Sequence, residues 1–316
     1  MRVLSSVPEL TTVSGPVVLA IGVFDGIHLG HRAVLQRAQL EAARICGTAI
    51  PLTFDPHPAR IIRPDQAPLQ LTTNAHKTRL FAALGFSHAL ILPFNQTLAA
   101  TEPAAFITGL TNAAAPLSAI CVGHDWSFGK GRAGNLGLLR TLGKQLSFEV
   151  IGVESVHWQN EPISSTRLRQ SIGSGDFESA NAMLGRPFTL LGSVKQGKQL
   201  GRTLGFPTAN LTLFNEQLPP KGVYAVKIIW GNQTLPGVAN LGTRPTIDGE
   251  IGEVLLEVHL LDFSGDLYGE LLEIEFASFL RAEKRFDSID SLRAQIKCDA
   301  ESARTALYSI AAKAYR

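Results

Sequence analysis

Two histidines stand three residues apart in the segment GVFDGIHLGH (22–31), which overlaps the end of a continuous apolar run. Such a run is typical of a buried strand, and apolar side chains recur at helical spacing after the segment. The backbone N–H groups and the dipole at a helix start favour phosphate, and glycines let a ligand approach the backbone. A lone histidine there is usually structural, but two can stabilise charge that develops on an attacked phosphate. The segment therefore predicts phosphate chemistry with His28 and His31 as catalytic residues, and it leaves the acceptor open.

A second chemical pattern lies in the segment FPTAN (206–210). The Thr208 hydroxyl and the Asn210 amide are two residues apart on an extended segment, so they face the same side and can bind one hard cation. Mg²⁺ that bridges nucleotide phosphates needs few protein ligands, so this pair is sufficient. The glycine-rich segment before it carries Lys195, Lys198 and Arg202, which alone is weak evidence because β-turns look similar.

The elements that position the histidines alternate between strands and helices. Apolar runs predict strands over 17–24, 48–54, 88–94, 118–123 and 148–153. Helical spacing between and after them predicts helices over 31–45, 73–84, 103–110, 136–145 and 176–184. Gly47 stands where a C-cap would end the first of these helices. This alternation predicts an α/β domain with a doubly wound parallel sheet.

The pattern changes near residue 186, where Gly185 and Pro187 follow the last of these helices. Six short strands are then predicted over 188–194, 209–213, 224–230, 235–241, 254–261 and 271–276. Strands at this spacing indicate a small closed antiparallel barrel, and a C-terminal helix is expected from about Ser288. Because 316 residues exceed the usual size of one domain, we expect two domains, 1–186 and 187–316.

Composition excludes several classes of protein. A net charge of +2 without a long basic run gives no footprint for nucleic acid. The apolar run at 17–24 is too short for a membrane span, and the N-terminus lacks a secretory signal. Cys46, Cys121 and Cys298 lie too far apart for a metal finger or a redox pair, so we expect three buried thiols in a cytoplasmic protein. The oligomeric state is not indicated.

The segment at 22–31 resembles the nucleotidyltransferase signature of the bacterial bifunctional riboflavin kinase/FAD synthetases. The segments LTFDPHP (52–58), VGHDWSFGKGRAG (122–134) and ISSTRLR (163–169) resemble the same family in the same order. By this resemblance Phe128 and Gly129 belong to a block that lines the FMN and ATP site, and 163–169 is a loop that contacts ATP phosphates. Trp126 and Ser127 depart from the aromatic and basic pair that is common there. The nucleotide-binding residues implied in this half are Gly22, Phe24, Gly30, Asp125, Arg132, Ser165, Thr166 and Arg169.

The C-terminal half resembles the riboflavin kinase module of the same family, in PTAN, PKGVYAV (220–226), GVANLGTRPTI (237–247) and the segment 256–276. The resemblance implies that Thr208 and Asn210 bind Mg²⁺ and ATP phosphates, and that Glu257 is the base for the riboflavin 5′-hydroxyl. Without it, Glu257 would be an outward-facing strand residue. Gln196 stands where a histidine is expected. The further nucleotide-binding residues implied here are Gly197, Lys198, Gly201 and Arg202.

The resemblance implies an enzyme with two activities. Riboflavin is phosphorylated by ATP to FMN, and FMN is then adenylylated by ATP to FAD with release of pyrophosphate; Mg²⁺ is the cofactor. One alternative is a nucleotidyltransferase for pantetheine phosphate or another small phosphate, against which the PTAN segment argues. The other is a flavin sensor without activity, against which His28, His31 and Glu257 argue.

Overall fold

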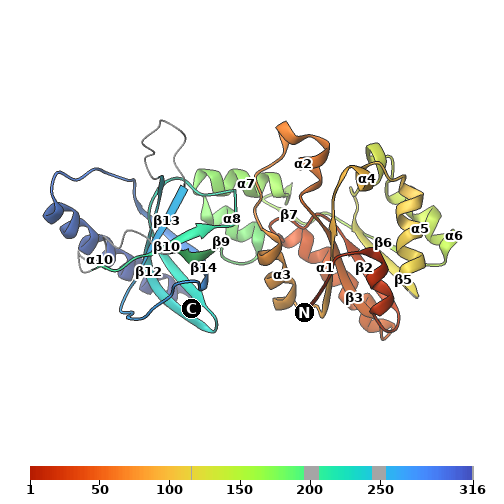
Figure 1. Ribbon diagram of the computed structural model, residues 1–316, viewed down its shortest axis with the longest axis horizontal. Coiled ribbons are helices and arrows are strands. Elements are labelled where there is room, and N and C mark those ends of the chain that lie inside the picture. Colours follow the sequence, from red (N-terminus) through yellow and green to blue (C-terminus); the bar gives the residue numbers. More distant parts are fainter. Residues whose placement is uncertain (115, 196–205, 244–253, 315–316) are drawn as a thin grey trace. The chain divides into compact units, whose positions relative to one another are not determined.

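The computed structural model describes residues 1–114, 116–195, 206–243 and 254–314, with side chains to residue 309. The chain forms two compact units, Met1–Leu168 and Arg169–Arg316, and Figure 1 labels most of their helices and strands. The division falls within a helix, whereas the sequence places the domain boundary at 186/187. Where the chain can be cut into folding fragments therefore stays a prediction.

The first unit is built on a parallel sheet of six strands in the order β1-β4-β3-β2-β5-β6. The five predicted strands are present, so the predicted doubly wound sheet is confirmed. The short edge strand β1 was not predicted. The strands are β1 (Arg2–Leu4), β2 (Val17–Ile21), β3 (Thr48–Asp55), β4 (His88–Pro93), β5 (Leu117–Gly123) and β6 (Glu149–Val153).

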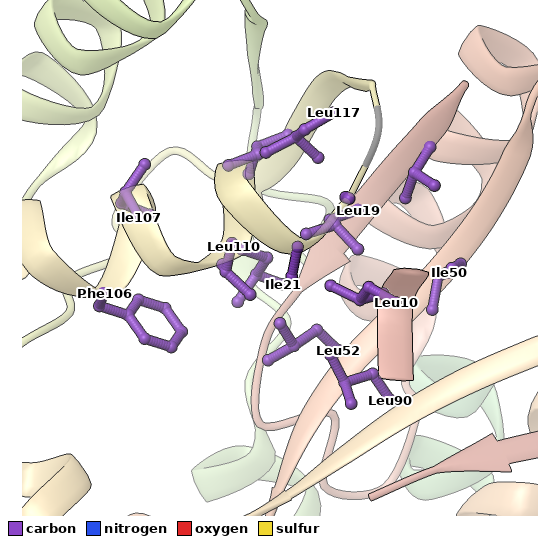
Figure 2. Packing of buried hydrophobic residues seen from close by; sticks show 14 of the residues in the cluster. Leu10, Leu19, Ile21, Ile50, Leu52, Leu90, Phe106, Ile107, Leu110 and Leu117 are labelled. Carbon is purple, nitrogen blue, oxygen red and sulfur yellow. The ribbon is translucent and has the colours of Figure 1, made fainter. Parts of the chain in front are cut away.

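Both faces of this sheet are covered, and β2 is buried along its whole length. Leu19 and Ile21 point to one face, where Figure 2 shows them gathered with Leu110 of α5, while Val18 and Ala20 point to the other. This alternation is expected of a central strand between two helical layers. The helices are α1 (Leu29–Arg44), α2 (Pro58–Ile62), α3 (Asn74–Ala83), α4 (Gln96–Ala99), α5 (Pro103–Ala113) and α6 (Leu136–Leu146). Shorter elements are the 3-10 turns η1 (Val7–Thr12), η2 (Pro64–Gln66) and η3 (Lys130–Arg132), and the hairpin β7 (His157–Trp158) and β8 (Glu161–Pro162).

The second unit contains the predicted barrel. Its six strands pair antiparallel in the order β10-β13-β12-β11-β14-β9, and the pair β9–β10 closes the ring. The strands are β9 (Thr189–Lys195), β10 (Ala209–Leu213), β11 (Gly222–Trp230), β12 (Gln233–Thr243), β13 (Val254–Leu260) and β14 (Leu271–Arg281). The predicted C-terminal helix is α10 (Ile289–Ala314).

The segment ISSTRLR, which the sequence predicts as a loop, begins a helix instead, α7 (Ser165–Ser174). The Ser164 hydroxyl accepts a hydrogen bond from the backbone N–H of Arg167 at 3.3 Å. Serine is a preferred N-cap because its oxygen satisfies a backbone N–H at the start of a helix. The run of hydroxyl side chains therefore marks a helix start, and the loop prediction is wrong.

Helix α8 (Phe177–Leu184) packs into the core of the second unit. The Phe177 ring is 9% exposed and stacks on the rings of Phe188 and Phe276, with centroids 6.2 and 5.6 Å apart. Its edge meets Tyr224 of β11 at 5.9 Å. The Asn181 side chain also accepts a hydrogen bond from the Phe188 backbone N–H at 2.7 Å. Residues before the predicted boundary at 186/187 thus complete the apolar core beside the barrel.

The three cysteines differ in their surroundings. Cys121 is buried in β5, and burial raises the pKa of its thiol to about 12. Cys46 and Cys298 are exposed, so the expectation of three buried thiols is wrong for these two, which lie at the end of α1 and on the outer side of α10. Within the described ranges, no helix is long and apolar enough to cross a membrane.

Candidate active sites

The His28–His31 pair lies after β2, at the carboxyl edge of the parallel sheet. The chain continues from β2 to β3 on one side, while β5 pairs with β2 on the other. Ligands of open α/β sheets bind outside the carboxyl ends of the strands at such a switch point. His28 is the N-cap of α1 and 5% exposed; its Nδ1 accepts a hydrogen bond from the His31 backbone N–H at 3.3 Å. The two rings stack with centroids 3.7 Å apart, so the structure brings both predicted residues together at a helix start.

The turn that carries the histidines is held by a buried carboxylate, which our sequence analysis did not single out. Asp25 is 1% exposed, and its side chain accepts hydrogen bonds from the backbone N–H groups of Leu71 and Thr72 and from the Thr72 hydroxyl, at 2.9–3.2 Å. The Thr72 hydroxyl in turn accepts from the backbone N–H of Gly26 at 2.9 Å. Gly26 has a φ of +87°, which favours glycine. The Asp-Gly pair after a buried strand was the only signal in the sequence, because residues 71–72 reach this turn only in the fold.

Three predicted nucleotide-binding residues shape the histidine pair. The Phe24 side chain is 1% exposed, and its ring meets the rings of His31 and Phe81 edge to face at 5.4 and 5.9 Å. A Cβ at Gly22 would lie 2.9 Å from the Phe24 ring, and one at Gly30 would lie 3.1 Å from His28 Cε1. The two glycines therefore leave room for these rings, and any contact of Phe24 with a nucleotide must come from its backbone.

The loop after β5 leaves the sheet at the same edge, because β5 is the parallel neighbour of β2. Asp125 and Arg132 are both exposed in this loop, as a binding role requires. The Arg132 Nε donates a hydrogen bond to the Ser127 hydroxyl at 2.7 Å. The Arg132 guanidinium group therefore lies beside Ser127, the position at which the resemblance led us to expect a basic residue.

Two further residues of this loop are structural. Phe128 is buried and stacks on Trp126 with centroids 4.3 Å apart. Gly129 has a φ of +73°, and a side chain there would collide with Pro103. Both residues therefore fix the shape of the loop, and their place in the block that lines the FMN and ATP site stays a prediction.

The start of α7 is joined to the histidine turn. The Ser165 hydroxyl donates a hydrogen bond to the backbone oxygen of Asp25 at 2.9 Å. Thr166 is exposed beside it, and Arg169 follows Ser165 by one helical turn on α7. Ser165 therefore reaches the candidate site, and its hydroxyl hydrogen is used to hold the turn.

The second candidate site lies on the outer wall of the barrel. Leu256 and Val258 of β13 are fully buried, while Leu255, Glu257 and His259 are half-buried on the opposite face. The predicted division of this strand into two faces is thereby confirmed. Glu257 pairs with Asn210 of β10, and Thr208 precedes Asn210 by two residues.

The start of the PTAN segment is fixed against β13. The Nδ1 of His259 lies 2.8 Å from the backbone oxygen of Pro207, and the Phe206 ring meets the His259 ring edge to face at 5.5 Å. A carbonyl oxygen only accepts hydrogen bonds, so His259 carries a proton on Nδ1. This contact holds Thr208 and Asn210 next to the strand that carries Glu257.

Four predicted nucleotide-binding residues of the barrel lie outside the described residues: Gly197, Lys198, Gly201 and Arg202. Gln196 also lies outside them. In the part of the chain that is described, no three His, Cys, Asp or Glu side chains converge into a metal site. The donors that remain are oxygens of Thr208 and Asn210. A hydroxyl and an amide oxygen suit Mg²⁺, which is commonly held by few protein ligands together with substrate phosphates and waters.

The fold and the two sites define a two-domain transferase in which an α/β unit and a barrel each carry a site for phosphate chemistry. Residues 11–167 match the family described as FAD synthetase, and residues 184–307 match the family described as riboflavin kinase. The chain therefore belongs to the bifunctional riboflavin kinase/FMN adenylyltransferases. It phosphorylates riboflavin to FMN and adenylylates FMN to FAD, using ATP in both reactions. The alternatives of a different phosphate acceptor and of a flavin sensor without activity are excluded.

Curated relatives match over nearly the whole chain. The bifunctional riboflavin kinase/FMN adenylyltransferase of Escherichia coli K12 is 40% identical over 288 residues, which is 91% of each chain. The protein of the same name from Pseudomonas fluorescens is 38% identical over 287 residues, 91% of this chain and 92% of its own. A crystal structure described as a macrolide-efflux protein from Streptococcus pneumoniae superposes with a TM-score of 0.81 at 29% identity, covering 96% of this chain and 99% of its own.

Proposed function

We propose that the two reactions use two separate sites, with His28 and His31 serving adenylyl transfer and Glu257 serving riboflavin phosphorylation. The observation that carries the first half is the stacked histidine pair at the start of α1. The second half rests on Glu257 lying directly opposite Asn210 on the outer wall of the barrel.

In adenylyl transfer, the FMN phosphate attacks the α-phosphorus of ATP and pyrophosphate leaves. The His28 Nδ1 accepts the His31 backbone N–H, so the proton of the neutral ring lies on Nε2. Nε2 can therefore donate to a phosphate oxygen on which charge develops, as can the backbone N–H groups at the start of α1. No covalent intermediate on the protein is needed, because both reactants are held in place.

The positive charge for the phosphates of this site comes from Arg132, and the resemblance alone adds Arg169. Ser127 holds Arg132 in place, which compensates for the missing basic residue at position 127. A guanidinium group binds phosphate oxygens through two parallel hydrogen bonds. We assign Asp125, Ser165 and Thr166 to the same nucleotide site, with Gly22, Phe24 and Gly30 acting through the backbone and through the shape of the turn.

In the kinase reaction, Glu257 takes the proton of the riboflavin 5′-hydroxyl as that oxygen attacks the γ-phosphorus of ATP, whose bond to the bridging oxygen breaks so that ADP leaves. Thr208 and Asn210 would hold Mg²⁺, which neutralises charge on the ATP phosphates when it is bound. The Asn210 Oδ1 supports this assignment, because it is buried from solvent and accepts no hydrogen bond from any residue that the structure describes. The resemblance adds Gly197, Lys198, Gly201 and Arg202 as phosphate-binding residues.

We also propose a cytoplasmic location. Cys46, Cys121 and Cys298 are all free thiols, and two of them are exposed. Exposed thiols persist in a reducing compartment.

The test is an incubation with riboflavin, ATP and Mg²⁺ in which FMN and FAD are separated by chromatography. For His31→Ala we expect FMN to accumulate without FAD. For Glu257→Gln we expect FMN formation to fall about 10²–10⁴-fold, the usual contribution of a general base, while supplied FMN is still converted to FAD. Undiminished FAD formation by His31→Ala, or unchanged kinase kinetics of Glu257→Gln, would remove the respective assignment.

A further inference from the structure

Asn240 lies on β12, directly opposite Glu257 on the side away from Asn210. The register places Asn210, Glu257 and Asn240 in one row across three neighbouring strands. Side chains in such a row share one face, and directly opposite Cβ atoms are about 4.5–5.5 Å apart. Asn240 is thus a direct cross-strand neighbour of the proposed base, as Asn210 is.

The amide oxygen of Asn240 has no hydrogen-bond donor among the described residues. This Oδ1 atom is also buried from solvent. The same is true of the Asn210 Oδ1, to which we assign a magnesium ion. A buried acceptor without a donor destabilises the fold, and asparagine is a poor strand former. The described residues therefore give no packing reason for an amide at position 240, whereas a ligand hydroxyl would satisfy its oxygen.

The two ends of the row differ in charge. Lys195 of β9 pairs with Asn210, so a positive side chain lies at the end of the row where the cation and the ATP phosphates would bind. At the other end, the Glu283 carboxylate lies against Gly242, the next outward position after Asn240, so close that a side chain at Gly242 would collide with it. A negative group there disfavours phosphate and suits a neutral, hydroxyl-rich substrate.

We propose that Asn240 binds the ribityl chain of riboflavin, its Oδ1 accepting a hydrogen bond from a ribityl hydroxyl. This inference rests on the proposed role of Glu257, since the 5′-hydroxyl must lie at that carboxylate, with the phosphates on the Asn210 side. The rest of the ribityl chain then extends along the row toward Asn240. Asn240 is in this view a binding residue that orients the acceptor and takes no part in the proton transfer.

The test compares Asn240→Ala with Thr234→Ala in the full-length enzyme. Thr234 is an exposed residue on the same face of the same strand, so its truncation is a matched control. For Asn240→Ala we expect the KM for riboflavin to rise about 3- to 10-fold, the range of one neutral hydrogen bond, with the KM for ATP within twofold of wild type. FAD formation from supplied FMN depends on the first unit and measures the concentration of enzyme, whereas a KM for ATP within twofold of wild type shows that the barrel is folded. The control should leave all three values unchanged.

Lumiflavin, which has the flavin ring but no ribityl chain, locates the contact. As a competitive inhibitor it should bind Asn240→Ala and wild type equally, because it cannot reach Asn240. An unchanged KM for riboflavin, a rise in the KM for ATP instead, or an equal loss of lumiflavin affinity would each overturn the inference. If Asn240→Ala does not fold, Asn240→Val, which favours a strand and has no hydrogen-bond acceptor, must show the same loss. A failure of the Glu257 assignment is separate, because Glu257→Gln is judged by kcat and Asn240→Ala by riboflavin affinity.

Discussion

Replacing Phe177 by alanine should destabilise the second unit while leaving the first intact. The ring is 9% exposed and contacts Phe188, Tyr224 and Phe276 with centroids 5.6–6.2 Å apart. Truncation of a buried phenylalanine costs about 3–5 kcal/mol, because it removes apolar burial and leaves a cavity. A domain has about 5–15 kcal/mol of stability in all, so this loss is a large share. For a unit of this size about 4 kcal/mol lowers Tm by roughly 8–16 °C.

Differential inactivation measures this effect in one sample. After heating at graded temperatures, FMN formation from riboflavin reports the second unit, and FAD formation from FMN reports the first. We expect Phe177→Ala to lose the kinase activity at a temperature about 10 °C lower than wild type, with the FAD reaction unchanged. Tyr308→Ala is the control, because Tyr308 is 75% exposed on α10 and its truncation should change stability by less than about 0.5 kcal/mol.

Two fragments extend the test to the predicted domain boundary. The sequence predicts that the fragment 187–316 folds and phosphorylates riboflavin, but this fragment lacks α8. We expect the fragment 169–316, which includes Phe177 and Asn181, to be the more stable by several kcal/mol. Two results would show that α8 is not part of the core. One is a fragment 187–316 as stable as the fragment 169–316. The other is a loss of less than about 1 kcal/mol in the free energy of unfolding for Phe177→Ala.

Two further substitutions probe the first unit. Asp25→Asn keeps the size of the side chain but cannot accept all the hydrogen bonds of the carboxylate. We therefore expect FAD formation to fall at least tenfold while FMN formation is unchanged. Wild-type rates of both reactions in Asp25→Asn would show that the turn needs no carboxylate. Lys77 on α3 is fully buried, and burial lowers its pKa against the opposing charges of Asp25 and Asp55. The unfolded chain therefore binds this proton more tightly, so the free energy of unfolding of wild type relative to Lys77→Met should rise with pH up to about 10.4. Urea titrations of both proteins across this range check it, and a flat difference would contradict the pKa shift.

The elements that sequence patterns predicted are those whose burial is visible locally. The continuous apolar run at 17–24 and the alternating residues of 254–261 identify β2 and β13, because each strand's surroundings determine its own pattern. The three-residue strand β1 has no such pattern. It exists because Arg2–Leu4 pair with β4 far along the chain. The sequence pattern did not predict the roles of Asp25 and Asn240 for the same reason, since their partners are distant in sequence.

At the end of α1, a glycine correctly predicted where the helix stops, but it stands there for another reason than the expected one. Gly47 was expected as the C-cap of this helix, but the helix ends at Arg44 and Cys46 takes the left-handed conformation with a φ of +51°. Gly47 is needed because a side chain there would collide with the backbone oxygen of Pro16, just before β2. A glycine after a helix thus predicted the helix end, while its actual role depends on a close approach between distant segments.

The barrel separates the residues that hold it together from those proposed to do chemistry. Along β13, Leu256 and Val258 fill the interior while Glu257 faces out, and Asn210 and Asn240 repeat this division on the neighbouring strands. Saturation mutagenesis at Asn240, the outward position proposed to contact the substrate alone, should therefore change substrate preference without unfolding most variants. Such a scaffold offers a route to kinases for flavin analogues in which ring and side chain are altered independently.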